Sequence, residues 1–322
     1  MAGSSYGERR KKKIEKQKAR EERRSTQYEK KILLTEADLK DMNFEQKLWV
    51  YVRTFFIAGW PFILYLFMPA VCMALGRMLL YVTLYKNGTE EISDALHFYT
   101  FCGIVLTLYI LHKSAKSKGS ALFKEAGLSF ENLKWKTIGK LFLFGFLISG
   151  MISAILSLIP DRWMTSYDEA TTSMFSGYDT LFSFICLLVL TPLAEEIVFR
   201  GYLLRRLKPL FKRTKSIWIV SILFALCHMS LVWIIYGTII GFVMAFLADR
   251  YDNTAYSLAL HIGFNIFTLV NYIVSGIPNV SDVLFGHKWL FIIYAAAFAI
   301  PGYFLFIDYC KKEQISLRKN RG

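Results

Sequence analysis

Several common sequence features are missing from this chain of 322 residues, and each absence excludes a class of protein. The five cysteines, at positions 72, 102, 186, 227 and 310, show no C-x-x-C spacing, so we expect buried free thiols and no disulfide framework. The N-terminal segment lacks the apolar core of a signal peptide. Polar and apolar residues do not alternate as they do in the strands of an outer-membrane barrel. No internal repeat is evident.

What the sequence has instead is a large share of apolar residues in long runs. Hydrophobic residues make up 54% of the chain and aromatic residues 16%. A helix needs about 20 apolar residues to cross a bilayer, and lipid cannot satisfy the backbone polar groups of other open structures. We therefore predict an all-α polytopic membrane protein with about eight transmembrane helices around a polar intramembrane cavity. The predicted spans are 55–84, 95–112, 138–159, 179–204, 216–230, 231–249, 254–274 and 288–309.

The fifth and sixth predicted spans are poorly separated, which leaves seven spans as the alternative. Only the short segment 229–231 can turn between them. The distribution of charge favours the even number, because it puts both ends of the chain on the same side of the membrane.

Positive charge is concentrated in alternate loops. Lys and Arg residues number 39 against 25 Asp and Glu, and they cluster before the first span, around 113–140, around 205–215 and at the C-terminus. Cytosolic loops carry such an excess, so both termini are predicted to be cytosolic. The predicted organisation is a basic cytosolic tail at 1–47, a membrane domain at 48–310 and a second basic cytosolic tail at 311–322.

The net charge of +14 fits a membrane partner better than a nucleic acid. Lys and Arg at the interface stop translocation and attract anionic lipids. We expect membrane lipids as partners and no nucleic acid. An integral multi-pass protein of this kind would lie in the plasma membrane of a bacterium or the endoplasmic reticulum of a eukaryote. The oligomeric state does not follow from the sequence.

Three short polar motifs lie inside the apolar segments. Ionisable side chains at membrane depth are costly, so they mark candidate functional sites. The motifs are E-E-x-x-x-R at Glu195, Glu196 and Arg200, F-x-x-x-H at Phe224 and His228, and H-x-x-x-N at His261 and Asn265.

The two adjacent glutamates are expected to have different roles. On an α-helix Glu196 and Arg200 lie four residues apart and can pair, which would leave a neutralised pair that shapes the site. Glu195 points about 100° away and has no local cation, so it is the candidate general base. The alternative is that both glutamates are hydrated at the cytosolic interface.

The depths of the polar residues favour a shared site. With about 1.5 Å of rise per residue, Glu195 lies roughly 15 Å and His228 roughly 20 Å from the cytosolic ends of their helices. On the same basis His261 lies about 12 Å and Asn265 about 18 Å from the start of theirs. Three helices thus place a carboxylate, two imidazoles and a carboxamide in one layer.

The ordered motifs resemble those of the CPBP family, which includes type II CAAX prenyl endopeptidases and bacteriocin-processing intramembrane proteases. All three match in order and spacing, and the similarity covers about 180–275. The resemblance implies an eight-helix core enclosing a polar cavity open towards the cytosol, and hydrolysis of a peptide bond near the membrane. It also implies that Glu196 and Arg200 support the site.

The catalytic roles also follow from the resemblance. Glu195 and His228 would activate a water molecule, while His261 and Asn265 would stabilise the oxyanion. Hydrolysis in general needs a base, a positioned water and hydrogen-bond donors where charge develops, and these four side chains can supply them.

Zinc is the cofactor to consider. Two histidines and one glutamate can form a catalytic zinc site with a position for water, and here the candidate ligands are Glu195, His228 and His261. The H-E-x-x-H motif of many zinc peptidases is absent, however. If Glu195 were a ligand, the remaining base would be Glu196, which is expected to pair with Arg200. We therefore favour metal-independent hydrolysis.

Two other functions compete with a peptidase. One is a non-proteolytic scaffold or bacteriocin-immunity protein that regulates a partner, although such a protein has little use for four buried polar groups. The other is a small-molecule transporter, for which no inverted repeat is visible. The substrate could be prenylated, a pheromone, a leader peptide or a membrane-protein segment. The remaining histidines, His97, His112 and His287, are assigned to interface or packing roles.

The charge bias yields a topology prediction. Loops around 120 and 210 should face the cytosol, and loops around 90, 168 and 280 should face outward, because Lys and Arg are enriched in cytosolic loops. Single cysteines placed in these loops and labelled with an impermeant reagent in intact cells will test it. Strong labelling at position 120 from outside would contradict the span count.

Overall fold

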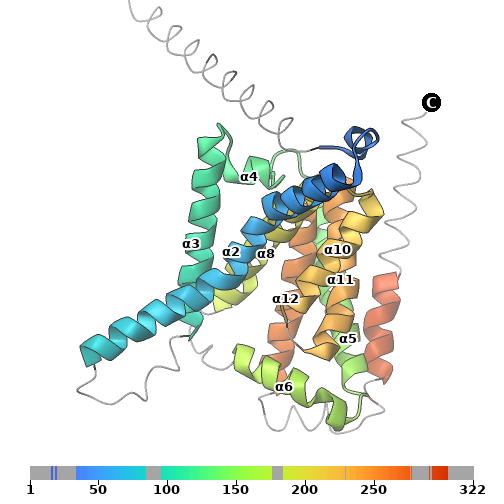
Figure 1. Ribbon diagram of the computed structural model, residues 1–322. Coiled ribbons are helices and arrows are strands. Elements are labelled where there is room, and N and C mark those ends of the chain that lie inside the picture. The colour runs from blue at the N-terminus through green and yellow to red at the C-terminus, as the bar shows by residue number, and fades with distance from the viewer. Residues whose placement is uncertain are drawn as a thin grey trace, which may run out of the picture. The chain divides into compact units, whose positions relative to one another are not determined.

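The computed structural model is helical throughout the part of the chain that it describes (Figure 1). It describes residues 34–84, 96–175, 184–228, 230–275 and 292–303, together with the single positions 16, 19, 277 and 290. No strand occurs among these residues. The prediction of an all-α polytopic membrane protein is confirmed. The four cysteines in the described ranges, Cys72, Cys102, Cys186 and Cys227, are free thiols.

Five described helices are long and apolar enough to cross a membrane. They correspond to predicted spans one, two, three, six and seven. Their bounds are α2 (Phe44–Leu84), α3 (Leu96–Ser117), α5 (Trp135–Leu156), α11 (Leu231–Tyr251) and α12 (Ala255–Ser275).

The other predicted spans are shorter or divided in the described residues. Span four is built from η3 (Cys186–Leu190), α8 (Thr191–Glu195), η4 (Glu196–Leu204) and α9 (Arg205–Leu207), and η3 and η4 are π-helical. Span five is α10 (Arg213–Leu226), with 14 residues. Span eight includes the apolar helix Ile292–Tyr303. The number of crossings therefore stays a prediction.

A helix that the sequence did not lead us to expect follows α5. The segment 160–178 was expected to be a loop, but α6 (Asp161–Phe175) occupies most of it. Pro160 and Asp161 are a helix-start signal, and Met164, Tyr167 and Thr171 recur at the spacing of one helical face. Hydropathy does not reveal this helix, because most of its residues are polar.

Short helices also occur in segments expected to be a tail or a loop. They are η1 (Glu36–Leu39) and α4 (Leu122–Glu125). At the start of η1 the backbone N–H and the hydroxyl of Thr35 both donate to the Asp38 carboxylate at 2.7 Å. Leu39 packs with Val50 and Leu210. Residues 34–47, which were assigned to the basic tail, therefore include the helix η1 and the start of α2. The domain boundaries stay predictions.

The described residues form two compact units. One unit comprises Met1–Leu128 and Ile197–Trp218, and the other comprises Ser129–Glu196 and Ile219–Gly322. Both histidines and both glutamates of the polar motifs belong to the second unit.

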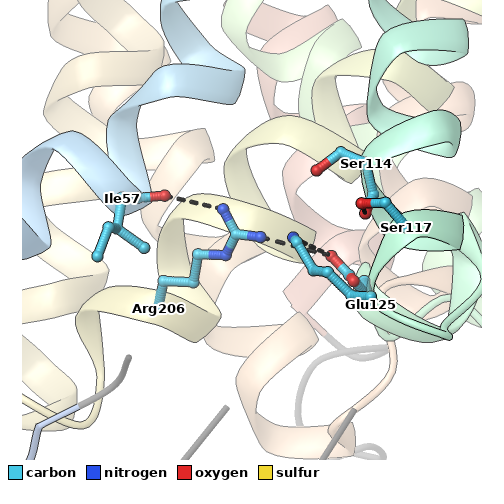
Figure 2. A network of polar contacts seen from close by, with 6 residues as sticks. Ile57, Ser114, Ser117, Glu125 and Arg206 are labelled. Atoms are coloured by element: carbon cyan, nitrogen blue, oxygen red, sulfur yellow. Dashed lines mark hydrogen bonds and ion pairs between the residues drawn. The ribbon is translucent and has the colours of Figure 1, made fainter. Parts of the chain in front are cut away.

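The first unit contains a partly buried polar network at a proline in α2 (Figure 2). Pro61 has no N–H, so the carbonyl of Ile57, four residues earlier, loses its helical donor. Arg206 replaces that donor, with Nη1 2.8 Å from the Ile57 oxygen. Glu125 balances the charge, since its Oε2 lies 3.4 Å from Arg206 Nη2 and 3.3 Å from Lys118 Nζ. The network compensates a backbone group that would otherwise be costly to bury.

In the second unit, α5 and α12 approach until their backbones touch. A Cβ on Gly145 would collide with the carbonyl oxygen of Leu260, and a Cβ on Gly263 would collide with that of Phe142. Small residues permit such contact between membrane helices. One turn further along, Ser149 Oγ lies 3.2 Å from Thr268 Oγ1. This contact sets the position of α12, which carries His261 and Asn265.

We predict that Gly263→Ala destabilises the protein and Gly139→Ala does not. The added methyl group at 263 meets backbone that cannot move away cheaply, which typically costs about 1–3 kcal/mol. Gly139 lies in α5, and a Cβ added there would meet nothing within 4 Å, so the same change should be neutral or stabilise by about 0.5–1 kcal/mol. Thermal unfolding of both variants in detergent will measure the difference. Equal stability of the two would contradict the close crossing.

Candidate active site

The four residues predicted to be catalytic all line one cavity in the second unit. Its atom-free space is about 930 Å³, including its open mouth. The four are Glu195, His228, His261 and Asn265. Glu195 ends α8, His228 follows the last turn of α10, and the other two lie on α12. Residues separated by up to 70 positions in sequence are therefore brought together as the depth argument predicted.

His261 lies between the two glutamates. Its Nδ1 is 2.9 Å from Oε1 of Glu196, and its Nε2 is 3.5 Å from Oε2 of Glu195. The two carboxylates thus contact opposite sides of one ring, consistent with different roles. The motif spacing does not predict the contact between Glu196 and His261.

The contact with Glu196 fixes the protonation of His261 at one nitrogen. An ionised carboxylate can only accept a hydrogen bond, so Nδ1 must carry a proton and donate it to Glu196. A carboxylate partner of this kind holds the orientation of an imidazole. The Nε2 atom is then the nitrogen that faces Glu195 and the cavity.

Ser257 completes the surroundings of Glu196. Its hydroxyl lies 2.5 Å from Glu196 Oε2, within the range of hydrogen bonds to an ionised oxygen, and 2.9 Å from the carbonyl oxygen of Thr254. Glu196 and Ser257 are both fully buried. The sequence held a signal for Ser257, because it precedes His261 by four residues and shares its helical face.

Phe224 explains the aromatic position of the second motif. Its ring packs edge to face against His228, at 5.3 Å between centroids, and against His261, at 5.9 Å. The carbonyl oxygen of Phe224 also lies 3.1 Å from Nδ1 of His228. Because a carbonyl accepts, Nδ1–H of His228 donates to it, and Nε2 of the neutral ring is left as an acceptor. This arrangement suits proton acceptance from water.

Asn265 is oriented by a backbone contact. Its Nδ2 lies 3.4 Å from the carbonyl oxygen of Leu187, in the π-helical segment η3. The carboxamide nitrogen has two N–H groups, so one remains for a ligand in the cavity. Short π-helical segments occur often at functional sites.

The pairing of Glu196 with Arg200 stays a prediction. Both side chains are buried, at 0% and 1% exposure. The spacing argument assumed an α-helix, whereas η4 is π-helical, with hydrogen bonds spaced five residues apart. Among the other histidines, His112 is exposed, and the side chains of His97 and His287 lie outside the described residues.

The donor set does not match a metal centre in the described part of the chain. No three His, Cys, Asp or Glu side chains there converge so that one ion could be held. The contacts of Nδ1 of His261 with Glu196 and of Nδ1 of His228 with a backbone carbonyl are compatible with a metal, because metal-binding histidines usually donate their second ring N–H in this way. The metal-independent mechanism therefore stays a prediction. No chemical step is assigned to zinc.

Comparison with known proteins adds two similarities. A family model described as type II CAAX prenyl endopeptidase Rce1-like matches residues 177–267, which contain all three polar motifs. The UPF0177 protein YbdI of Lactococcus lactis subsp. lactis (strain IL1403) is 28% identical over 191 residues, which cover 56% of this chain and 99% of that protein. No solved structure matches.

We predict that Ser257→Ala is more costly than Ser149→Ala. Both hydroxyls are buried, but Ser257 donates to a carboxylate whereas Ser149 bonds a neutral hydroxyl. Hydrogen bonds to charged groups contribute about 1.5–3 kcal/mol and neutral ones about 0.5–1.5 kcal/mol. The free energy of unfolding of the two variants will test the ionised state of Glu196. Equal losses would indicate that Glu196 is neutral.

Proposed function

We propose that the protein is an intramembrane endopeptidase, because residues 177–267 match the family model described as type II CAAX prenyl endopeptidase Rce1-like. Its substrate is a membrane-associated or lipidated peptide or protein. The observation that carries the proposal is the convergence of Glu195, His228, His261 and Asn265 on one cavity. An acceptor pair and a donor pair in one enclosed space are what amide hydrolysis needs.

Glu195 and His228 activate the water. The Glu195 carboxylate and Nε2 of His228 both accept hydrogen bonds, so a water between them can lose a proton as its oxygen attacks the scissile carbonyl carbon. The proton then passes to the departing nitrogen when the C–N bond breaks. The products are a carboxylic acid and an amine, and the base is regenerated.

Asn265 and His261 stabilise the charge on the carbonyl oxygen. The second N–H of Asn265 can donate to it. Nε2 of His261 can donate only when the ring is doubly protonated, since Nδ1–H is already directed at Glu196. Ser257 holds the Glu196 carboxylate in place against Nδ1 of His261. Glu196 is therefore a positioning residue that acts through His261.

The protein lies in the plasma membrane in this proposal, with both termini in the cytosol. The bacterial relative favours that membrane over the endoplasmic reticulum, and the loop charges favour that orientation. Surrounding lipids and a peptide substrate are the expected partners.

Two substitutions will test the proposed roles. Glu195→Gln removes the base and should lower turnover by about 100-fold or more, with folding intact. Asn265→Ala removes an oxyanion donor and should lower turnover by about 100- to 1,000-fold with little change in KM, because the donor acts mainly in the transition state. Glu131→Gln, at an exposed loop position, is the matched control. Cleavage of a peptide library by the purified protein, followed by mass spectrometry, provides the measurement.

The same assay addresses zinc. We expect chelators to leave turnover unchanged. Stoichiometric zinc that is lost with activity on chelation, and that restores activity when added back, would overturn the metal-independent mechanism. A Glu195→Gln variant that kept normal turnover would refute the assignment of the base. If no peptide is cleaved and the variant still performs the cellular role, a scaffold or bacteriocin-immunity function is favoured.

A further inference from the structure

The cavity extends from the site in one direction along α12. The α12 residues that line it are His261, Phe264, Asn265 and Thr268. Residues 255–260, on the other side of His261, are all buried and do not line it. The cavity is therefore closed by packed side chains towards the start of α12.

The neighbouring helices show the same direction. On α5 the lining residues are Ser149, Ile152 and Ser153, in the last third of the helix. The cavity continues to α6, where Tyr167 and Thr171 line it. It thus leads from the layer of Glu195 and His261 to the polar helix that follows α5.

The basic residues lie at the opposite ends of these helices. Lys134 and Lys136 are at the start of α5, and Arg250 is in the last turn of α11, next to the start of α12 in sequence. The positive-inside rule assigns those ends to the cytosol. The cavity then extends from the layer of the site towards the half of the membrane that faces away from the cytosol, whereas the family resemblance implied an opening on the cytosolic side.

The lining beyond Glu195 is mainly apolar and includes several uncharged polar groups. It carries hydroxyl groups on Ser149, Ser153, Thr171, Thr191 and Thr268. Hydroxyls both donate and accept, so they suit the amide groups of an extended peptide.

Aromatic rings form the other wall. Tyr167 packs on Trp233 at 5.8 Å, and Trp233 packs on His228 at 4.9 Å. These rings can contact apolar side chains of a ligand. No Lys or Arg is among the described lining residues, so a free C-terminal carboxylate has no cation to meet it there.

We propose that the substrate enters from the extracytosolic side, beneath α6, as an uncharged internal segment of an exported or membrane-bound peptide. This inference rests on the proposed peptidase function and on the orientation given by the loop charges. It assigns Tyr167 and Thr171 to the entrance and Ser153 to the passage.

Cysteine labelling tests the entrance without requiring catalysis. In a variant with all five native cysteines replaced, Ser153→Cys and Thr171→Cys are exposed to an impermeant maleimide in intact cells. We expect both to be labelled, because a thiol reacts as its thiolate and needs water. Ile155→Cys is the matched control on α5, since Ile155 is 46% exposed but does not line the cavity, and it should stay unlabelled. Ser120→Cys should react only after permeabilisation.

Other labelling patterns would overturn the inference. Reaction of Ser153→Cys only after permeabilisation would place the entrance on the cytosolic side, and no reaction in either condition would show that water does not fill the passage. Labelling of Ser120→Cys from outside would reverse the orientation. A bulky maleimide on Ser153→Cys should also block peptide cleavage. If the cysteines are labelled as expected but the protein cleaves no peptide, the proposed entrance is supported and the proposed peptidase function is refuted.

Discussion

The burial of the Glu196 carboxylate is the constraint on which the site depends. A charge without solvent must be met by hydrogen bonds or by another charge, and the donors to Glu196 are Ser257 and His261 of α12. The carboxylate therefore fixes α12 at the junction of α8 and η4. It also fixes which nitrogen of His261 is protonated, and hence which one faces the cavity.

Close backbone packing and local departures from the α-helix make this arrangement possible. Gly145 and Gly263 let α5 and α12 touch, which positions His261 and Asn265. The π-helical segment η3 offers the carbonyl of Leu187 to Asn265. In the other unit, a side chain compensates a backbone group in a similar way. Arg206 donates to the Ile57 carbonyl, which lacks its helical donor because of Pro61 (Figure 2). In both units a polar group that is at least partly buried is compensated by a residue distant in sequence.

The cavity separates acceptors from donors. In the proposed mechanism Glu195 and Nε2 of His228 act as acceptors and Asn265 and His261 as donors, so one cavity would hold both a water and a polarised carbonyl. The Rce1-like match covers all of these residues, and the relative YbdI extends the similarity over a longer part of the chain. The lining residues also show in which direction the cavity extends from the site, and hence by which route a substrate could reach it. The motifs by themselves do not contain this information.

The sequence by itself determined the helical membrane class and the set of polar motifs, because hydropathy and motif spacing are local properties of the chain. Depth along each helix even predicted that Glu195, His228, His261 and Asn265 would share a layer. Tertiary structure alone decided that Glu196 bonds His261 and Ser257, that Leu187 orients Asn265, and that α6 borders the cavity. Such contacts depend on the rotation and approach of separate helices. Those are set by packing at Gly145 and Gly263 and by π-helical turns that α-helical spacing does not describe.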